Sequence, residues 1–410
     1  MERPGTGVAA PVVTGLGVIT PLGLGTDDFW AATLEGRRGL GPITRFDPSS
    51  YPVRLAGEVR GFTAADHVPS RAIPQTDHWT HMGLAAARLA LADAEVDPAE
   101  LPEYEMAVVT AASSGGTEFG QREMVNLWGR GPGFVGAYQS IAWFYAATTG
   151  QISIRHGMRG PCGVIATEQA GGLDALAHAR RLLRDGTRVA VSGGADASLC
   201  PYGLVAQLSS GRLSVRTDPA RAYLPFDPDA CGYLPGEGGA LLIVEDADHA
   251  ARRGAPRVYG EIAGYGVTFD PPPGSSRPPA LRRAIENALA DAGAAPGDVD
   301  VVFADAMGVP ELDRIEADAL NGVFGPAGVP VTAPKTMTGR LYAGGAALDA
   351  VSALLSVRDA VIPPTVGVRE GAGGLDLVIG RPRPAPVRCA LVVARGYGGF
   401  NSALVVRAVP

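Results

Sequence analysis

An internal repeat constrains the fold of this chain more than any other feature of its sequence. Segment 89–116 predicts, in order, a helix, a loop, a buried strand and a glycine turn. Segment 287–308 predicts the same order, and both segments contain ALADA, beginning at residues 90 and 288. Any Ala-rich helix could supply five shared letters, so the common order of elements carries the argument. Self-similarity near half the length of a 410-residue chain predicts two similar halves packed together.

Strands and helices alternate within each half. Continuous apolar stretches predict strands buried on both faces, and the Ala- and Leu-rich runs between them predict helices. This alternation is typical of the α/β class, and we expect a largely parallel sheet. The predicted halves are residues 1–252 and 253–410, with surface loops at 267–280 and 370–386. The segments that carry this pattern are 188–199, 238–254, 343–364 and 388–409, the last predicting a hairpin.

Composition excludes several classes of function. The net charge is −7 and no basic stripe occurs, which argues against a nucleic-acid partner. The cysteines are far apart, which predicts neither a metal site nor a disulfide framework and fits a reducing cytoplasm. No stretch approaches the ~20 apolar residues of a membrane span, and the N-terminus does not resemble a signal peptide. The four cysteines are Cys162, Cys200, Cys231 and Cys389.

A tight turn at CGVIATEQAGGLDAL (162–176) is the most unusual local feature. Residues 164–166 predict the end of a buried strand, and a helix is expected from Ala170 onward. Enzymes often place a nucleophile at such a turn, because the first amides of a helix can bind developing negative charge. Here the turn carries Gln169, whose amide has no nucleophilic atom and does not titrate. The sequence therefore predicts the kind of turn on which enzymes place a nucleophile, but with a residue that cannot act as one.

Lys335 is the only lysine among 35 basic residues. Chance could leave one lysine in an Arg-rich chain, but we favour a requirement for a compact ammonium at this position. The acidic residues Asp227 and Glu237 lie in the glycine- and proline-rich stretch PFDPDACGYLPGEGG. We expect them to accept backbone amides rather than to bind a metal.

Six motifs in a fixed order resemble those of the β-ketoacyl synthase family. The resemblance covers essentially the whole chain and implies a thiolase-type fold: two similar halves, five layers in the order αβαβα, and a dimer. The motifs are VVTGLGVITPLG (12–23), ATEQAGGLDA (166–175), LPFDPDACGYLPGEGGALLIVED (224–246), DAMGVPELDRIEA (305–317), PKTMTGRLYAGGAALDA (334–350) and GYGGFNSA (396–403).

The resemblance also implies that the condensing residues of the family are missing. Active members have a Cys in the elbow, which carries the acyl chain, and two His that polarise the malonyl thioester. These positions are Gln169, Met307 and Arg340 here, while Lys335 falls on the motif Lys of the family. The six histidines of the chain all precede residue 250. Condensation needs an activated nucleophile and donors for an enolate, so this chain is not expected to condense alone.

The elbow ATEQAGGLDA and the neighbouring GQISIRHGMRGP (150–161) resemble one subgroup, the chain length factors of type II aromatic polyketide synthases. That resemblance implies a cytoplasmic heterodimer with a catalytic ketosynthase, acting on chains carried by a phosphopantetheinylated acyl carrier protein. It implies no bound cofactor. The apolar, aromatic segment 140–154 matches the dimer interface of the family.

The role of Gln169 leaves alternatives open. Its amide could fill and hydrogen-bond a vestigial pocket, since buried polar groups must be satisfied. Alternatively, Gln169 and backbone donors from itself and Tyr397 could stabilise an enolate during malonyl decarboxylation. We favour the structural interpretation, with Met307 as a packing residue, Arg340 in an ion pair and Lys335 holding loops together. A third hypothesis is a purely structural partner that never touches the growing chain.

A helix predicted within TEFGQREMVNLW (117–128) borders the polyketide tunnel according to the resemblance. Thr117, Gly120 and Met124 fall on one face of it. An ordinary interface stripe would give the same pattern, but a glycine inside a helix costs about 1 kcal/mol against Ala and needs a spatial reason. In related subunits bulky side chains on this face shorten the product. The open face therefore predicts a decaketide or longer.

Overall fold

The computed structural model describes residues 10–409 except 273 and 372. Its two halves repeat one strand order, which confirms the predicted duplication. The first half has the order β6-β5-β7-β8-β1 and the second β11-β10-β15-β16-β9. The strands are β1 (Pro11–Thr20), β5 (Met106–Ala111), β6 (Cys162–Ile165), β7 (Val189–Asp196), β8 (Gly238–Asp246), β9 (Gly260–Phe269), β10 (Val301–Phe303), β11 (Pro330–Thr332), β15 (Cys389–Arg395) and β16 (Phe400–Arg407).

The sheets are mixed, so the expectation of a largely parallel sheet was wrong. Strands β5, β6 and β7 are parallel to one another, as are β10, β11 and β15. Strand β8 runs antiparallel to both β7 and β1, and β16 runs antiparallel to both β15 and β9. Continuous apolar strands report burial on both faces and do not report direction. Only the β15–β16 pairing could be predicted, because a short glycine turn joins the two strands.

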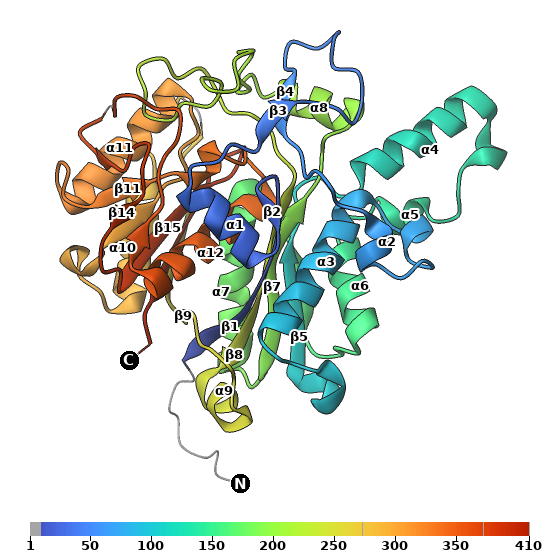
Figure 1. The fold of residues 1–410 in the computed structure, drawn as a ribbon, viewed down its shortest axis with the longest axis horizontal. Coiled ribbons are helices and arrows are strands. Elements are labelled where there is room, and N and C mark those ends of the chain that lie inside the picture. The colour runs from blue at the N-terminus through green and yellow to red at the C-terminus, as the bar shows by residue number, and fades with distance from the viewer. Residues whose placement is uncertain (1–9, 273, 372, 410) are drawn as a thin grey trace.

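Five layers stack across the molecule, as expected (Figure 1). Helix α3 (His78–Asp93) covers β1 and β8 on one side, and α10 (Leu281–Ala292) covers β9 and β16 on the other. Strands β1 and β9 pair, which joins the strands of the two halves into one sheet. Between its two halves lie α7 (Gly171–Arg184) and α12 (Ala343–Asp359), which contact strands of both halves. Helix α12 is buried from Ala343 to Ser356, which places it at the centre of the molecule.

The ALADA repeat marks where a helix backbone touches a glycine of the neighbouring strand. A Cβ atom at Gly15 in β1 would lie 2.3 Å from the Ala90 carbonyl oxygen of α3. A Cβ at Gly264 in β9 would likewise lie 2.3 Å from the Ala288 oxygen of α10. The stretches GLGV and GYGV that hold these glycines are thus the second part of the internal repeat. Any side chain there would push the helix off the sheet.

The aspartate of each ALADA segment completes this contact. Asp93 Oδ2 accepts a hydrogen bond from the Leu16 amide at 2.8 Å, next to the glycine of β1. Asp291 Oδ2 accepts one from the Tyr265 amide at 2.9 Å, next to the glycine of β9. Both strands have an irregularity in register near this point, which leaves the amide free for the carboxylate.

The edge strand β6 is less buried than the sequence indicated. It forms one end of the sheet path through the described residues, and Cys162 is exposed while the other three residues are partly exposed. The loop 370–386 also pairs locally, through β13 (Asp376–Leu377) and β14 (Arg383–Pro384). In the part of the chain that the structure describes, no helix is long and apolar enough to cross a membrane, and no His/Cys/Asp/Glu group has the arrangement of a metal site.

The remaining elements connect these layers. The helices are α1 (Thr26–Leu34), α2 (Ala64–His67), α4 (Thr117–Arg130), α5 (Gln139–Ala142), α6 (Ala147–His156), α8 (Pro201–Leu208), α9 (Ala247–Arg253) and α11 (Pro310–Phe324). The short strands are β2 (Gly23–Leu24), β3 (Leu40–Pro42), β4 (Leu55–Gly57) and β12 (Val361–Ile362). Short 3₁₀ helices span Ile73–Gln75, Pro98–Glu100, Glu103–Glu105, Pro132–Phe134, Glu168–Ala170, Pro296–Asp298 and Pro334–Thr336.

Candidate functional site

Gln169 lies in the 3₁₀ turn between β6 and α7 and is fully buried. Its amide packs against Gly345 in the first turn of α12, where a Cβ would lie 2.5 Å from Nε2. Neither Nε2 nor Oε1 has a hydrogen-bond partner among the described residues. The structural interpretation, in which protein groups satisfy this amide, is therefore incomplete. Unpaired buried polar atoms are costly, so packing against Gly345 does not by itself account for an amide at this position.

Arg340 is also fully buried and lies in the ion pair that the sequence analysis expected. Its Nη1 donates to Asp305 Oδ1 at 3.0 Å, and its Nε donates to Glu168 Oε1 at 3.4 Å. Its Nη2 donates to the Arg395 carbonyl oxygen, and the guanidinium lies 5.5 Å from the Tyr233 ring centre. Burial opposes the charge, but the Asp305 and Glu168 carboxylates raise the pKa of Arg340 well above its ordinary value. The cation is therefore fixed and permanently charged.

Glu168 connects Arg340 to the glycine turn before β16. Its Oε2 accepts a hydrogen bond from the Tyr397 backbone amide at 2.8 Å. The expectation that Tyr397 offers a free backbone donor is therefore wrong in this structure, because a carboxylate of the chain already uses that donor. Glu168 has a φ of +52°, in the left-handed region that residues with side chains rarely adopt.

A second group of buried ionisable residues holds the turn that contains Asp305. Glu316 accepts the Asp305 and Ala306 amides at 2.7 and 2.9 Å. Burial, and then the charge of Asp305, raise the pKa of Glu316 to about 7. Lys335 Nζ donates to the Ala304 carbonyl and pairs with Asp349 Oδ2 at 2.7 Å. The single lysine thus ties the strand end after β10 to helix α12.

Met307 packs among tyrosines and offers no hydrogen-bond donor. It is buried in a cluster that includes Tyr223, Tyr233 and Tyr342. Together with Arg212 and Tyr397 it lines a cavity of about 300 Å³ at the glycine turn 396–399. The cavity therefore reaches Met307, the first of the two positions where the family places a catalytic His.

The structure brings Gln169, Met307 and Arg340 into one centre, linked by Glu168, Asp305 and Tyr397. None of these side chains carries a thiol or an imidazole, so the centre can bind charge but cannot form an acyl intermediate. The histidines belong to other elements. They lie in α2 (His67), α3 (His78 and His81), α6 (His156), α7 (His178) and α9 (His249).

The predicted gate residues lie on α4, which projects from the body of the molecule (Figure 1). Thr117 and Gly120 are buried, while the Met124 side chain is 37% exposed. A Cβ at Gly120 would lie 2.8 Å from Cδ1 of Trp143. The expectation of empty space beside Gly120 was therefore wrong for this structure, because the Trp143 indole fills it.

Asp227 and Glu237 accept backbone amides, as expected. Asp227 Oδ1 accepts the Asp229 amide at 2.9 Å and Oδ2 accepts the Arg369 amide at 3.2 Å. Glu237 Oε1 accepts the Val59 amide at 3.0 Å. These carboxylates organise loops around the centre.

Comparison with known proteins identifies the family. The model of the β-ketoacyl synthase N-terminal domain matches residues 10–250, and that of the C-terminal domain matches residues 259–369. The chain belongs to the β-ketoacyl synthase family. It shares 63% identity over 402 residues with the tetracenomycin polyketide synthase ketoacyl synthase beta subunit of Streptomyces glaucescens, covering 97% of this chain and 98% of the relative. The actinorhodin polyketide putative beta-ketoacyl synthase 2 of Streptomyces coelicolor is 58% identical over 398 residues, with 97% and 98% covered.

Solved β-ketoacyl synthases show the same architecture. The chain superposes on the ishigamide ketosynthase/chain length factor with a TM-score of 0.90 at 28% identity, covering 98% of this chain and 100% of the other. It superposes on a type II ketosynthase in complex with its acyl carrier protein with a TM-score of 0.87 at 26% identity, with the same coverage. The thiolase-type fold predicted from the motifs is confirmed.

Two residues of this β-ketoacyl synthase centre, Glu168 and Asp305, were not predicted from the sequence. A signal for them existed, because a buried Arg340 requires carboxylates and both residues stand in the quoted motifs. Their assignment to Arg340 needed the fold, since Glu168 belongs to the first half and Arg340 to the second.

Proposed function

We propose that this chain is the non-condensing subunit of a type II polyketide ketosynthase, pairs with a catalytic ketosynthase in the cytoplasm and sets the length of the polyketide. The relatives named above are ketosynthase beta subunits or their equivalents, and one structural neighbour is a ketosynthase/chain length factor. No cofactor of its own is required, because the growing chain is carried on the phosphopantetheine of an acyl carrier protein. The ketosynthase neighbour bound to its acyl carrier protein supports that partner.

The observation that carries the proposal is a centre without a nucleophile within an intact ketosynthase fold. Gln169 replaces the nucleophile, Met307 provides no donor, and Arg340 is held by Asp305 and Glu168. Covalent acyl transfer needs an activated nucleophile, which this centre does not contain. The surrounding architecture is nevertheless retained in detail, which favours a role that depends on the shape of the subunit.

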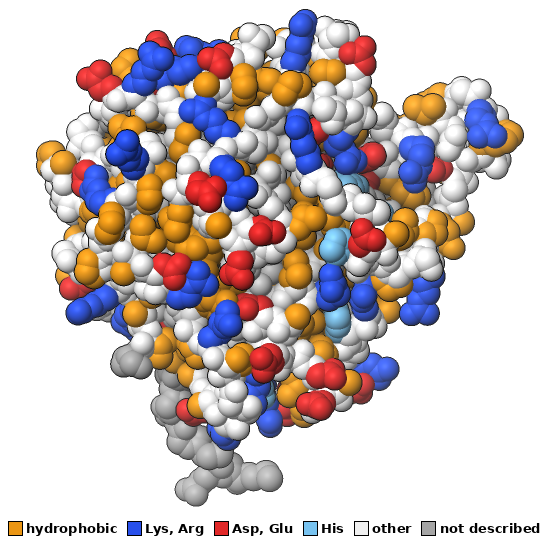
Figure 2. All heavy atoms as spheres, viewed as in Figure 1, with side chains coloured by type: hydrophobic (Ala, Val, Ile, Leu, Met, Phe, Trp, Pro, Cys, Tyr) orange, Lys and Arg blue, Asp and Glu red, His pale blue; other side chains and the backbone are white. Residues whose placement is uncertain are grey.

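A large exposed apolar surface supports a permanent partner. It covers α4, α5, α6 and the loop between them, at the right of the view in Figures 1 and 2. Monomeric proteins rarely expose contiguous apolar patches larger than a few hundred Å², and obligate interfaces often bury more than ~2,000 Å². The exposed residues are Met124, Val125, Trp128, Phe134, Tyr138, Ile141, Trp143, Phe144, Tyr145 and Ile154.

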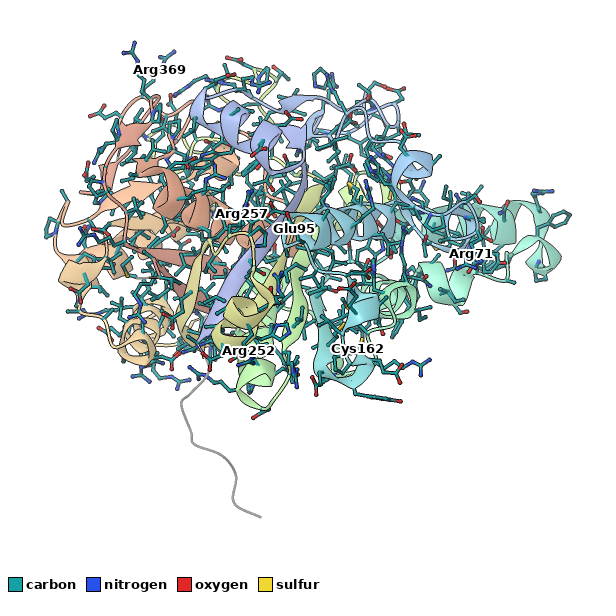
Figure 3. The ribbon with its side chains drawn as sticks, turned by 60° about the horizontal axis from the view of Figure 1, so that its bottom comes forward. Arg71, Glu95, Cys162, Arg252, Arg257 and Arg369 are labelled. Atoms are coloured by element: carbon teal, nitrogen blue, oxygen red, sulfur yellow. The ribbon has the colours of Figure 1, made fainter. Side chains whose placement is uncertain are left out.

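The edge strand β6 also offers a surface for a partner, in this case through its backbone hydrogen-bonding groups. Cys162 at its start is exposed and lies on the side brought forward in Figure 3. Unpaired edge strands tend to pair with another chain, so we propose that the ketosynthase partner covers β6 as well. The predicted tunnel then runs between α4 and the partner, and its length selects a decaketide or longer product.

A second candidate function is decarboxylation of a malonyl group to start synthesis. The Gln169 Nε2 group, buried without a hydrogen-bond partner among the described residues, favours it, because a substrate oxygen could accept a hydrogen bond from it. The Tyr397 amide argues against it, since Glu168 already occupies that donor. Decarboxylation predicts carbon dioxide release that Gln169→Ala abolishes, whereas our proposal predicts that Gln169→Ala leaves malonyl consumption by the pair unchanged.

The pairing is tested by expression with and without a catalytic ketosynthase. We expect the chain alone to self-associate or to be poorly soluble, and co-expression to give a 1:1 complex measured by light scattering. A stable, monodisperse monomer without a partner would contradict the proposal. A purely structural partner is distinguished by product length, which substitutions on α4 would then leave unchanged.

A further inference from the structure

We propose that Glu168 is an internal ligand of an anion-binding centre, formed by the Tyr397 backbone amide and the Arg340 guanidinium, and that this carboxylate keeps the centre closed to substrate oxygens. The inference concerns the chain itself and does not require the proposed function to be correct. It assigns a role to a residue that neither condensation nor tunnel shape explains.

Both carboxylate oxygens of Glu168 are engaged across the two halves of the molecule. Oε2 accepts from the Tyr397 amide at 2.8 Å, and Oε1 accepts from Arg340 Nε at 3.4 Å. Arg340 cannot follow a departing anion, because Asp305 and the Arg395 carbonyl hold its other nitrogens. Loss of Glu168 would therefore leave a donor and a fixed cation facing the same space. The 2.8 Å bond from the Tyr397 amide has the length of a strong charge-assisted hydrogen bond, and Arg340 adds its charge at longer range.

The backbone at Glu168 supports a dedicated role. A φ of +52° is unfavourable for a residue with a Cβ, and such conformations persist only where surrounding contacts impose them. The turn also leads directly into α7, whose N-terminal end favours negative charge. The strained turn thus points a carboxylate at two donors, the Tyr397 amide and the Arg340 guanidinium.

Without the Glu168 carboxylate, the anion-binding centre would accept a small carboxylate or a thioester oxygen. Tyr397 lines the 300 Å³ cavity that Met307 and Arg212 also border, and Arg395 lines it too. A molecule in that cavity therefore lies beside the Tyr397 residue whose amide Glu168 occupies. Occupation of the donor by Glu168 prevents the oxyanion stabilisation that decarboxylation or hydrolysis of a thioester requires.

Chemical rescue in the full chain, purified in the assembly in which it is stable, tests this inference. Glu168→Ala removes a CH₂COO⁻ fragment, which acetate can replace. We expect a lower unfolding midpoint and faster hydrogen exchange of the peptide containing residues 396–400. Acetate at about 0.1 M should reverse roughly half or more of the decrease in the unfolding midpoint and should slow the hydrogen exchange of this peptide. A ligand that binds only the folded state stabilises that state.

Two controls separate anion binding from general effects. Neutral acetamide and chloride at equal concentration should restore much less than acetate. Glu168→Gln fills the same space and should respond to acetate no more than the unmodified chain. Should Glu168→Ala fold poorly, Glu168→Gly accepts the positive φ without strain, and propionate then matches the missing fragment.

The inference is overturned if acetate stabilises Glu168→Ala no more than chloride does, or if acetamide is equally effective. Unchanged exchange of residues 396–400 in Glu168→Ala would equally show that the carboxylate does not hold the Tyr397 amide. Neither result affects the pairing experiment, which measures a different property of the chain.

Discussion

At the scale of single residues, the buried charges of the centre make the most direct prediction. Arg340→Met leaves Asp305 without its cation at a position that solvent does not reach. Breaking a buried pair costs about 3–5 kcal/mol of unfolding free energy, because the remaining charge is uncompensated. Urea unfolding of Arg340→Met should show a decrease in unfolding free energy of that size.

A surface pair provides the matched control for Arg340. Arg383 binds Asp376 through two hydrogen bonds of 2.6 and 2.8 Å, but both side chains are more than a third exposed. Arg383→Met should cost less than about 1 kcal/mol, since water screens and replaces such pairs. If the two variants lost equal amounts of unfolding free energy, burial of Arg340 would have no energetic consequence.

Restoring the nucleophile alone should not restore condensation. In Gln169→Cys the thiol stands just before α7, which favours the thiolate, but the family His positions still hold Met307 and Arg340 rather than imidazoles. Glu168 also occupies the Tyr397 amide. We expect no chain extension by the variant without a ketosynthase partner, measured by product mass. Measurable extension would show that one residue alone separates this chain from active members of its family.

The centre shows what sequence can and cannot predict at this scale. The pairing of Arg340 with a carboxylate followed from the cost of a buried, permanently charged guanidinium. The contact between Glu168 and Tyr397 could not be predicted, because it joins a strained turn in one half to a glycine turn in the other. Sequence order carries no information about which amide a carboxylate reaches.

At the scale of elements, Asp77 joins the beginnings of two helices. It precedes α3, and its oxygens accept the Trp79 amide at 3.1 Å and the Phe119 amide of α4 at 2.6 Å. Burial raises the pKa of Asp77 to about 6, although these amides oppose the shift. The raised pKa means that its contribution to stability is full below the unfolded value of 3.8 and is lost as the pH rises to about 6.

The pH dependence of Asp77→Asn tests this link. Between pH 4 and 6 the unmodified chain should lose up to about 3 kcal/mol of unfolding free energy relative to the variant. Asp376→Asn should show the opposite direction at lower pH: hydrogen bonds from Arg383 lower the pKa of Asp376, so the unmodified chain loses unfolding free energy relative to this variant as the pH falls below 3.8. Denaturant unfolding at several pH values measures both differences. If the unfolding free energies of Asp77→Asn and the unmodified chain change with pH in parallel, the raised pKa of Asp77 would be contradicted.

Helix α4 carries the prediction about product length. Gly120→Phe must displace the Trp143 indole, which packs where the new side chain would stand. Moving these rings toward the partner narrows the proposed tunnel, so the variant, alone or with Met124→Phe, should give a shorter dominant product. Malonyl consumption should stay largely intact. The measurement is the product mass distribution of the reconstituted pair.

Gly129→Phe is the matched control on the same helix. Position 129 lies on the opposite face of α4 from position 120, and nothing lies within 4 Å of a Cβ there. Its product length should equal that of the unmodified pair. An unchanged length for Gly120→Phe with Met124→Phe in a soluble, active pair would place the determinant of length elsewhere.

Most elements could be predicted from the sequence, but their exposure and direction could not. Helices α7, α10 and α12 and the β15–β16 hairpin follow from local periodicity and glycine turns. The antiparallel pairings of β8 with β7 and of β16 with β9, and the exposure of β6, do not, since apolar content is similar in either direction and at either position. The role of Trp143 beside Gly120 was also hidden, because the two residues meet only in the fold.

At the scale of the whole molecule, duplication explains why a centre without a nucleophile keeps its fold. The two halves bury α7 and α12 against each other, and the residues of the centre stand at the ends of these elements. The core is therefore independent of the catalytic side chains, which could change without loss of the architecture. The division at residues 252 and 253 stays a prediction.

Reconstitution of the pair with its acyl carrier protein tests the central claim most directly. The ketosynthase partner, this chain and the mixture are each supplied with malonyl-carrier protein, and product masses are recorded. We expect no extended product from this chain alone, little or none from the partner alone, and one dominant long polyketide from the mixture. Extension by this chain alone, or the same product at the same rate from the partner alone, would contradict the claim.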